Sequence, residues 1–330
     1  MEPVRVIGEP AQVIETLRGW LDDGDPPPLL VETSGSTGTP KRVLLSRRAV
    51  LASVAATARR LGSEGRWALR LPASYVAGVQ VIVRSLVAGH EPELDRWADA
   101  TSTSLVPTQF QRLLDSETDV AALAAMDAVL LGGGPIDPLL RQRAEAAGIR
   151  VVATYSMAET CGGCVYDGYA LDGVAVAVGA DGRVRLGGPT LFEGYDGDPA
   201  ATAEALVDGW FLTSDAGRLD DDGRLHVLGR VDEVVVSGGV NVPTPAVAAR
   251  LREHPDVTDA AVIGVPDDEW GNRVVAFVVG SIDLDDAREW VAEVRPRSWA
   301  PREVIAVDRL PLLANGKVDR VSLRERAGGP

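Results

Sequence analysis

The stretch Thr33-Ser34-Gly35-Ser36-Thr37-Gly38-Thr39-Pro40-Lys41 combines hydroxyl side chains, two glycines and a lysine in one short segment. It follows the apolar residues 29–31, which predict a buried strand, and the sequence after it returns to helical spacing. Glycines let backbone N–H groups approach an oxygen closely, hydroxyls add donors and lysine adds a charge. The stretch therefore predicts a loop that wraps a polyphosphate. It is not a Walker A loop, because Pro40 precedes the lysine and Arg42 follows it. A solvated Ser/Gly turn is the alternative.

Lysine is rare in this chain. Of the 33 lysines and arginines only Lys41 and Lys317 are lysine, and both lie in loops that contain glycine. Lysine and arginine are not interchangeable where a compact ammonium group must reach one oxygen. The pattern indicates that both lysines are required, although an exposed loop lysine such as Lys317 is more often a solvated charge.

Composition limits the classes of partner. The chain has 330 residues, 45% of them hydrophobic, and a formal net charge of -15, with a pI of about 4.7. Such an acidic chain is not typical of a nucleic-acid binder. Neither a membrane-spanning apolar run nor a signal-peptide layout is found, and two cysteines do not make a disulfide scaffold. We expect a cytoplasmic protein without nucleic-acid partners or membrane insertion.

Hydrophobic periodicity predicts an α/β fold. Helices are expected at 11–23, 50–61, 78–88, 108–114 and 138–147, and strands at 67–71, 104–106, 128–131 and 150–154. This alternation predicts parallel βαβ units with a ligand site beyond the carboxyl ends of the strands. Loops beginning at Thr33, Pro72, Gly132 and Tyr155 each follow an expected strand.

The pattern changes after about residue 164. Asp181-Gly182 and Asp222-Gly223 predict hairpin turns between alternating strands, which makes this part antiparallel. After residue 230 we expect a helix at 245–252, strands at 260–265 and 274–279, and a helix at 285–294. The predicted architecture is a large domain at 1–230, with a parallel βαβ sheet and an antiparallel part, followed by a small α+β domain at 231–330.

Several further motifs follow the expected strands. The run Gly132-Gly133-Gly134 lets a flat base lie against bare backbone, or is an ordinary turn. The segment 155–160 offers an aromatic ring, a carboxylate suited to Mg²⁺ and a hydroxyl, or a helix start resembling a capping box. Asp215 and Arg230 can hold ribose hydroxyls, or are surface turn residues. Cys161 and Cys164 form a C-x-x-C pair without histidines at ligand spacing, and structural thiols are favoured over a redox or zinc site.

Five elements in this order resemble those of the adenylate-forming superfamily of acyl-CoA synthetases, adenylation domains and luciferases. They are the loop 33–41, Tyr-x-x-x-Glu-Thr at 155–160, Thr-x-Asp at 213–215, Gly-Arg-x-Asp at 229–232 and Gly-Lys at 316–317. A closer resemblance, on residues 71–78, 104–109 and 159–168, is to the o-succinylbenzoate–CoA ligases of menaquinone synthesis in their short actinobacterial form.

The resemblance implies a ligase that forms an acyl-AMP and then an acyl-CoA, with ATP and CoA as substrates and Mg²⁺ as cofactor. It places Thr33, Ser34, Gly35, Ser36, Thr37, Gly38 and Lys41 on the β- and γ-phosphates, and Gly132, Gly133, Gly134 and Tyr155 at the adenine. It places Glu159 on Mg²⁺, Thr160 on the α-phosphate, and Asp215 and Arg230 on ribose, and it makes Ser156 a further ATP-binding residue. It makes Asp232 the hinge, Lys317 the catalytic bridge between acid and α-phosphate, and Ser237, Gly238 and Gly239 the loop for CoA.

The acid implied is an aromatic dicarboxylate, and its unreactive carboxylate is expected on Arg84, with Gln80 and Tyr75 beside it. Departures from the usual pattern occur at Tyr75, Ser156, Ala158, Ser214 and Val247, and the chain is shorter than typical members. Alternatives are a ligase for another aryl or acyl acid, an enzyme that loads a carrier protein, and a nucleotide-binding sensor without turnover. The sequence allows a homodimer.

Overall fold

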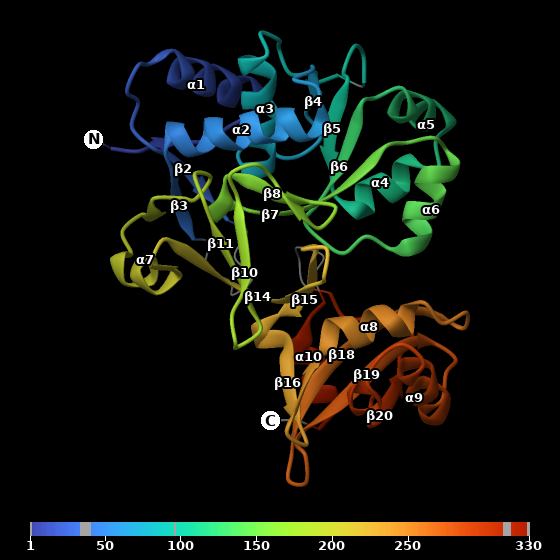
Figure 1. Ribbon diagram of the computed structural model, residues 1–330. Coiled ribbons are helices and arrows are strands. Elements are labelled where there is room, and N and C mark those ends of the chain that lie inside the picture. Colours follow the sequence, from blue (N-terminus) through green and yellow to red (C-terminus); the bar gives the residue numbers. More distant parts are fainter. Residues whose placement is uncertain (1, 34–40, 96, 313–317, 329–330) are drawn as a thin grey trace. The chain divides into compact units, whose positions relative to one another are not determined.

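The computed structural model describes residues 2–33, 41–95, 97–312 and 318–328, and the side chain of Asp232 is outside this description. The chain forms two compact units (Figure 1). The first contains residues 1–177, 185–213 and 219–225, and the second contains 178–184, 214–218 and 226–330. The domain limit expected at 230/231 stays a prediction.

A six-stranded sheet organises the first unit. Its order is β4 (Trp67–Ala68), β5 (Ser102–Leu105), β6 (Ala128–Leu131), β7 (Val151–Met157), β8 (Gly162–Tyr166) and β9 (Tyr169–Ala170). Strands β4 to β7 are parallel, whereas β8 and β9 are antiparallel. Figure 1 shows α2 (Arg47–Leu61) and α3 (Val76–Val87) on one side, and α4 (Pro107–Leu113), α5 (Glu117–Ala124) and α6 (Pro138–Ala146) on the other.

The α/β expectation is confirmed, and side-chain packing explains the layers. Apolar residues of β5 and β6, including Leu105, Val129 and Leu131, form one buried cluster with Phe110 of α4 and Leu123 of α5. Helix α2 ends at Gly62, whose φ of 75° is the left-handed conformation in which glycine terminates helices.

A second sheet corrects one expectation about the phosphate loop. Its order is β1 (Val4–Arg5), β2 (Leu29–Glu32), β3 (Arg42–Leu45) and β12 (Gly194–Tyr195), and α1 (Pro10–Asp22) precedes β2. Strands β2 and β3 are antiparallel neighbours, so the loop joins the two arms of a hairpin. The expectation that helical spacing follows the loop directly is wrong, because Val43 and Leu45 are buried as strand residues before α2 begins.

The third sheet confirms the expected antiparallel part. Its order is β10 (Ala175–Val178), β11 (Arg183–Gly187), β14 (Trp210–Leu219) and β13 (Leu206–Val207), with β15 (Leu225–Arg230) also paired to β14, and α7 (Pro199–Ala205) precedes β13. Gly182 and Gly223 have φ values of 77° and 76°, which explains why Asp-Gly pairs occupy both turns.

The second unit is built on β18 (Val257–Asp267), β19 (Gly271–Gly280) and β20 (Glu303–Ala306), with β20 parallel to β19. Residues of α8 (Thr244–Arg252) and α9 (Leu284–Ala292) form one apolar cluster with this sheet. Leu323 of α10 (Arg320–Arg326) belongs to a second cluster with Ile263 and Phe277. A hairpin of β16 (Val234–Ser237) and β17 (Val240–Pro243) precedes α8.

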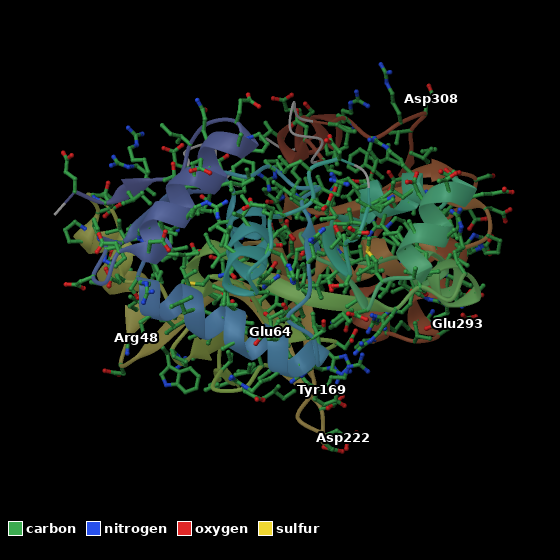
Figure 2. All side chains as sticks on the ribbon, turned by 90° about the horizontal axis from the view of Figure 1, so that it is seen from above. Arg48, Glu64, Tyr169, Asp222, Glu293 and Asp308 are labelled. Atoms are coloured by element: carbon green, nitrogen blue, oxygen red, sulfur yellow. The ribbon has the colours of Figure 1, made fainter. Side chains whose placement is uncertain are left out.

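Short 3-10 turns occupy Ala158–Thr160, Val231–Glu233 and Arg297–Trp299. Strand β7 continues to Met157, so Tyr155 and Ser156 are strand residues paired with β8. The end expected for this strand at residue 154, and the helix start that segment 155–160 also allowed, are therefore wrong. Exposed side chains such as Arg48, Glu64 and Tyr169 are labelled in Figure 2.

Candidate active site

Two predicted site residues, Lys41 and Glu159, meet at Tyr195 near the loop end of the β2–β3 hairpin. The N–H of Thr33 donates to the carbonyl of Lys41 at 2.9 Å, which closes the loop between them. The Nζ atom of Lys41 lies 3.4 Å from the hydroxyl of Tyr195, and that hydroxyl donates to Oε1 of Glu159 at 2.9 Å. The structure thus brings the predicted phosphate lysine and the predicted metal carboxylate to the same tyrosine. Residues 34–38 lie outside the described part of the chain.

Tyr195 was missed by sequence reasoning. It is separated from Glu159 by 36 positions and from Lys41 by 154, so nothing local marks it. Burial and the neighbouring negative charge of Glu159 raise the pKa of Tyr195 above its ordinary value, which keeps the hydroxyl protonated as a donor. The only local signal is Gly194, whose φ of 154° is a conformation suited to glycine.

Glu159 fits the role of a magnesium ligand. It is half-buried, and only one of its oxygens has a hydrogen bond among the described residues, from Tyr195. Mg²⁺ usually binds one or two carboxylates together with substrate phosphates and water, so one free carboxylate oxygen is a sufficient protein contribution. Among the described residues no group of three His, Cys, Asp or Glu side chains could hold a metal by itself.

The residues predicted at the adenine end lie directly after β6 and within β7, which are neighbouring strands. A Cβ atom on Gly132 would lie 2.4 Å from Oγ1 of Thr154 and 3.4 Å from Oγ of Ser156, so only glycine fits there. Gly133 has a φ of 79°, and Gly133 and Gly134 are exposed. Tyr155 is half-buried in β7. These residues form a bare stretch of backbone beside β7, as the interpretation of a flat-base slot requires.

Thr160 is fully buried, and its hydroxyl lies 2.8 Å from the carbonyl of Gly162 and 3.2 Å from that of Met157. A hydroxyl has a single proton to donate, and in Thr160 that proton is already donated to a backbone carbonyl of the same turn. The expected contact of Thr160 with the α-phosphate stays a prediction. Cys161 and Cys164 are free and buried, and burial raises the pKa of the Cys164 thiol to about 12. The preference for structural thiols is consistent with these environments.

The predicted acid-binding residues lie on α3. Gln80 is 1% exposed and Arg84 is 5% exposed. Neither polar atom of the Gln80 amide has a hydrogen-bond partner among the described residues, and its Cγ lies 3.1 Å from the position of a Cβ on Gly162. Arg84 donates to Oγ1 of Thr57 at 3.2 Å and lies near the hydroxyl of Tyr166, at 3.5 Å. Within the described residues no carboxylate is within ion-pair distance of Arg84.

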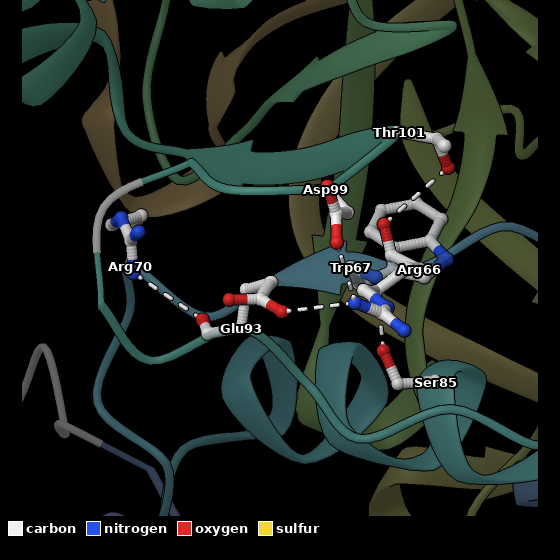
Figure 3. A network of polar contacts seen from close by, with 7 residues as sticks. All are labelled: Arg66, Trp67, Arg70, Ser85, Glu93, Asp99 and Thr101. Atoms are coloured by element: carbon white, nitrogen blue, oxygen red, sulfur yellow. Dashed lines mark hydrogen bonds and ion pairs between the residues drawn. The ribbon is translucent and has the colours of Figure 1, made fainter.

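A network of polar contacts surrounds Arg66 and Trp67 at the start of β4 (Figure 3). The guanidinium of Arg66 lies 3.3 Å from carboxylate oxygens of both Glu93 and Asp99. The next residue, Trp67, donates its backbone N–H to Oγ of Ser85 on α3 at 2.9 Å. The bond from Trp67 to Ser85 holds β4 against α3, the helix that carries Arg84. Tyr75, the residue before α3, is 44% exposed and makes no side-chain hydrogen bond to cap that helix.

The remaining predicted residues belong to the second unit. Asp215 and Arg230 are half-buried and both have interacting partners. Ser237 ends β16, and Gly238 and Gly239, with φ values of 56° and 77°, form the turn of the hairpin. The N–H of Gly238 donates to the carbonyl of Trp270 at 2.9 Å. Asp232 lies in the 3-10 turn before β16, and Lys317 is outside the described residues.

Comparison with known proteins agrees with this geometry. Residues 22–184 match the family described as AMP-binding enzyme, and residues 246–317 match the AMP-binding enzyme C-terminal domain. The chain is 44% identical over 98% of its length to a probable 2-succinylbenzoate–CoA ligase of Mycobacterium tuberculosis, of which it covers 94%. The chain belongs to the AMP-binding enzyme family. The resemblance to the adenylate-forming superfamily is therefore confirmed.

Other relatives of this AMP-binding enzyme agree. A 2-succinylbenzoate–CoA ligase of Listeria monocytogenes is 31% identical over 89% of the chain, which covers 69% of that enzyme. The o-succinylbenzoate CoA synthetase of Bacillus subtilis, solved with the acyl-adenylate OSB-AMP, has a TM-score of 0.77 and 26% identity, with 92% of this chain and 69% of that one covered. No helix in the described part of this AMP-binding enzyme is long and apolar enough to cross a membrane. The homodimer stays a prediction.

Proposed function

We propose that this AMP-binding enzyme is a 2-succinylbenzoate–CoA ligase of menaquinone synthesis. The observation that carries the choice of acid is Arg84, a buried guanidinium without an acidic partner among the described residues. A buried cation without a counter-ion is costly, and an anionic substrate that reaches it would supply that counter-ion. The relatives named above act on a substrate with two carboxylates, which leaves one to be recognised while the other reacts.

The nucleotide is assigned to the first unit and to two residues of the second. Residues 33–38 and Lys41 hold the β- and γ-phosphates, the triple glycine with Tyr155 receives adenine, and Ser156 is a further ATP-binding residue. Asp215 and Arg230 hold ribose, and Thr160 is assigned to the α-phosphate on the resemblance alone. Glu159 would hold Mg²⁺, which when bound neutralises charge on the phosphates. Two observations support these assignments. Lys41 and Glu159 both contact Tyr195, and position 132 lacks room for a Cβ atom, so its backbone stays bare.

In the first step a carboxylate oxygen of the acid attacks the α-phosphorus. The bond from the α-phosphorus to the bridging oxygen breaks, and pyrophosphate leaves with the bonding electrons. Two anions must approach each other, so catalysis depends on positive charge and alignment. Lys317 bridges the attacking carboxylate and the α-phosphate, while Lys41 stays with the departing pyrophosphate.

The acid site combines Arg84 and Gln80 on α3 with Tyr75 before it. Gln80 lies beside Gly162, and within the described part of the chain both of its amide atoms are without hydrogen bonds and can bond to a ligand. Arg84 is partly engaged by Thr57 but retains guanidinium donors, and its Nε has no partner in the part of the chain that the structure describes. We assign the unreactive carboxylate to Arg84 and a neighbouring polar atom of the acid to Gln80.

In the second step the small domain turns about Asp232, which withdraws Lys317. The Ser237-Gly238-Gly239 turn then receives the pantetheine arm of CoA. The thiol sulfur attacks the acyl carbon, the acyl–phosphate bond breaks and AMP leaves. The positive φ values at Gly238 and Gly239 support this assignment, because such a turn exposes bare backbone.

Pyrophosphate release measured with ATP, Mg²⁺ and a panel of acids, with and without CoA, tests the proposal. We expect release with 2-succinylbenzoate and acyl-CoA formation when CoA is added. Release with a different acid would replace the substrate, and release without a thioester would favour transfer to a carrier protein. No release with any acid would favour a nucleotide-binding sensor.

A further inference from the structure

Tyr195 stands between two oppositely charged side chains. Its hydroxyl lies 2.9 Å from Oε1 of Glu159 and 3.4 Å from Nζ of Lys41, and that Nζ atom is 4.6 Å from the centre of the Tyr195 ring. A carboxylate only accepts hydrogen bonds and an ammonium only donates them. The proton of the hydroxyl therefore points to Glu159, and its lone pair faces Lys41.

The tyrosine is held rigidly in this place. It lies on β12 opposite Val43 of β3, two positions after Lys41, and its N–H donates to Oγ1 of Thr202 at 2.8 Å. Its ring packs against Phe192 with 5.0 Å between centroids. The N–H of Phe192 donates to the backbone carbonyl of Glu159 at 2.9 Å. The segment 192–195 thus fixes both the backbone and the carboxylate of Glu159.

We infer that Tyr195 is a positioning residue that keeps Lys41 and Glu159 apart and ready for a metal–polyphosphate pair. This inference rests on the proposed function. With the hydroxyl between them, Lys41 retains two N–H donors and Glu159 retains one oxygen. Without it, the ammonium and the carboxylate attract each other and can form a direct ion pair, which would occupy the groups that the metal and the phosphates require.

The substitution Tyr195→Phe tests this directly, because it removes the hydroxyl and keeps the ring. Binding of a non-hydrolysable ATP analogue is measured by calorimetry with Mg²⁺ and again with EDTA. We expect the Kd with Mg²⁺ to rise about tenfold, the effect typical of one charge-assisted hydrogen bond, and the Kd in EDTA to change much less. Tyr169→Phe is the matched control, since Tyr169 is exposed at the surface (Figure 2) and its hydroxyl has no hydrogen bond among the described residues.

A double-mutant cycle separates positioning from general stability. If Tyr195 acts through Glu159, Tyr195→Phe should have no further effect on Mg²⁺-dependent binding once Glu159→Gln is present. Additive losses would overturn the inference, as would an unchanged Kd in the single variant. Failure of the unaltered protein to bind the analogue would instead reject the proposed function, so the two failures are distinguishable. Melting temperatures of both tyrosine variants should stay close to that of the unaltered protein.

Discussion

The Arg84 guanidinium lies over the indole ring of Trp67, with its Cζ atom 4.8 Å from the ring centre. Trp67 is 1% exposed and is bonded through its backbone to α3, so this contact joins the strand at the sheet edge to the proposed acid site. Cation–π contacts contribute about 0.5–2 kcal/mol and also fix the plane of the guanidinium. The orientation of Arg84 is therefore set before any acid binds.

Replacing Arg84 with methionine should separate acid recognition from folding. The side chain keeps its volume while its charge is lost, and exchanging a buried charge for an apolar group is often neutral or stabilising. We expect KM for 2-succinylbenzoate to rise more than about tenfold, since charged hydrogen bonds contribute about 1.5–3 kcal/mol. KM for ATP and the melting temperature should change little. Steady-state kinetics check this, with Arg59→Met, at an exposed arginine of α2, as control. An unchanged KM for the acid would reject the assignment.

Gly238→Ala should slow thioester formation selectively. A Cβ atom at this position would lie 2.8 Å from Cε3 of Trp270, and the φ of 56° is already unfavourable for alanine. We expect acyl-CoA formation from supplied acyl-AMP to fall about tenfold, or about 1.4 kcal/mol in barrier, with pyrophosphate release largely kept.

Gly223→Ala is the matched control, because Gly223 has a φ of 76° and nothing within 4 Å of an added Cβ. It imposes a similar backbone strain at the turn between β14 and β15. Equal loss of thioester formation in the two variants would show that strain alone is responsible, and would contradict the role given to the Ser237–Gly239 turn.

Lys317→Ala should nearly abolish acyl-AMP formation. The lysine is assigned to the first step only, and it is withdrawn before the thiol attacks. Thioester formation from supplied acyl-AMP should therefore be spared, as rapid-quench measurement of each half-reaction would show. Arg324→Ala, at an exposed arginine of α10, serves as control. Parallel loss of both half-reactions would contradict a mechanism with two domain orientations.

Cys164 should make stability depend on pH in the alkaline range. Its pKa is raised from 9.0 to about 12 by burial, so the folded state keeps a proton that the unfolded state releases. The stabilisation by the protonated thiol is complete below pH 9 and is lost as the pH rises toward 12. Between pH 8 and pH 10 the free energy of unfolding falls by about 1.4 kcal/mol for one such thiol. In urea unfolding, the free energy of unfolding of Cys164→Ala should fall by correspondingly less over this pH range. Identical pH dependence in the two proteins would show that the thiol does not contribute.

Local patterns explain which parts of the fold were predictable. Apolar spacing located α1, α2 and α3, and Asp-Gly pairs located two hairpin turns, because both signals depend on neighbouring residues. Strand β3 was missed because its four residues lie between a polar loop and a helix with a similar apolar content. Four more short elements were missed: α5, α10, β20 and the β16–β17 hairpin. They are stabilised by tertiary contacts more than by local propensity, so their sequences carry little signal.

The candidate site divides in the same way. Lys41, Glu159 and Gly132 were found because their types and spacing carry chemistry. Tyr195 was not, because its relation to Glu159 exists only after β12 has paired with β3. The burial of Gln80 was equally invisible, because α3 is buried at consecutive positions 78–85 and its pattern marks no single inward face. The roles given to the site residues remain predictions.

The unpartnered amide of Gln80 has a consequence for directed evolution. A buried polar group without hydrogen bonds lowers stability by about 1–3 kcal/mol, so an apolar residue at position 80 should make the protein more resistant to heat. If Gln80 binds the acid as proposed, selection for thermal tolerance alone would therefore favour variants that have lost acid recognition. A stabilisation campaign on this scaffold should hold position 80 constant and look for its gains elsewhere.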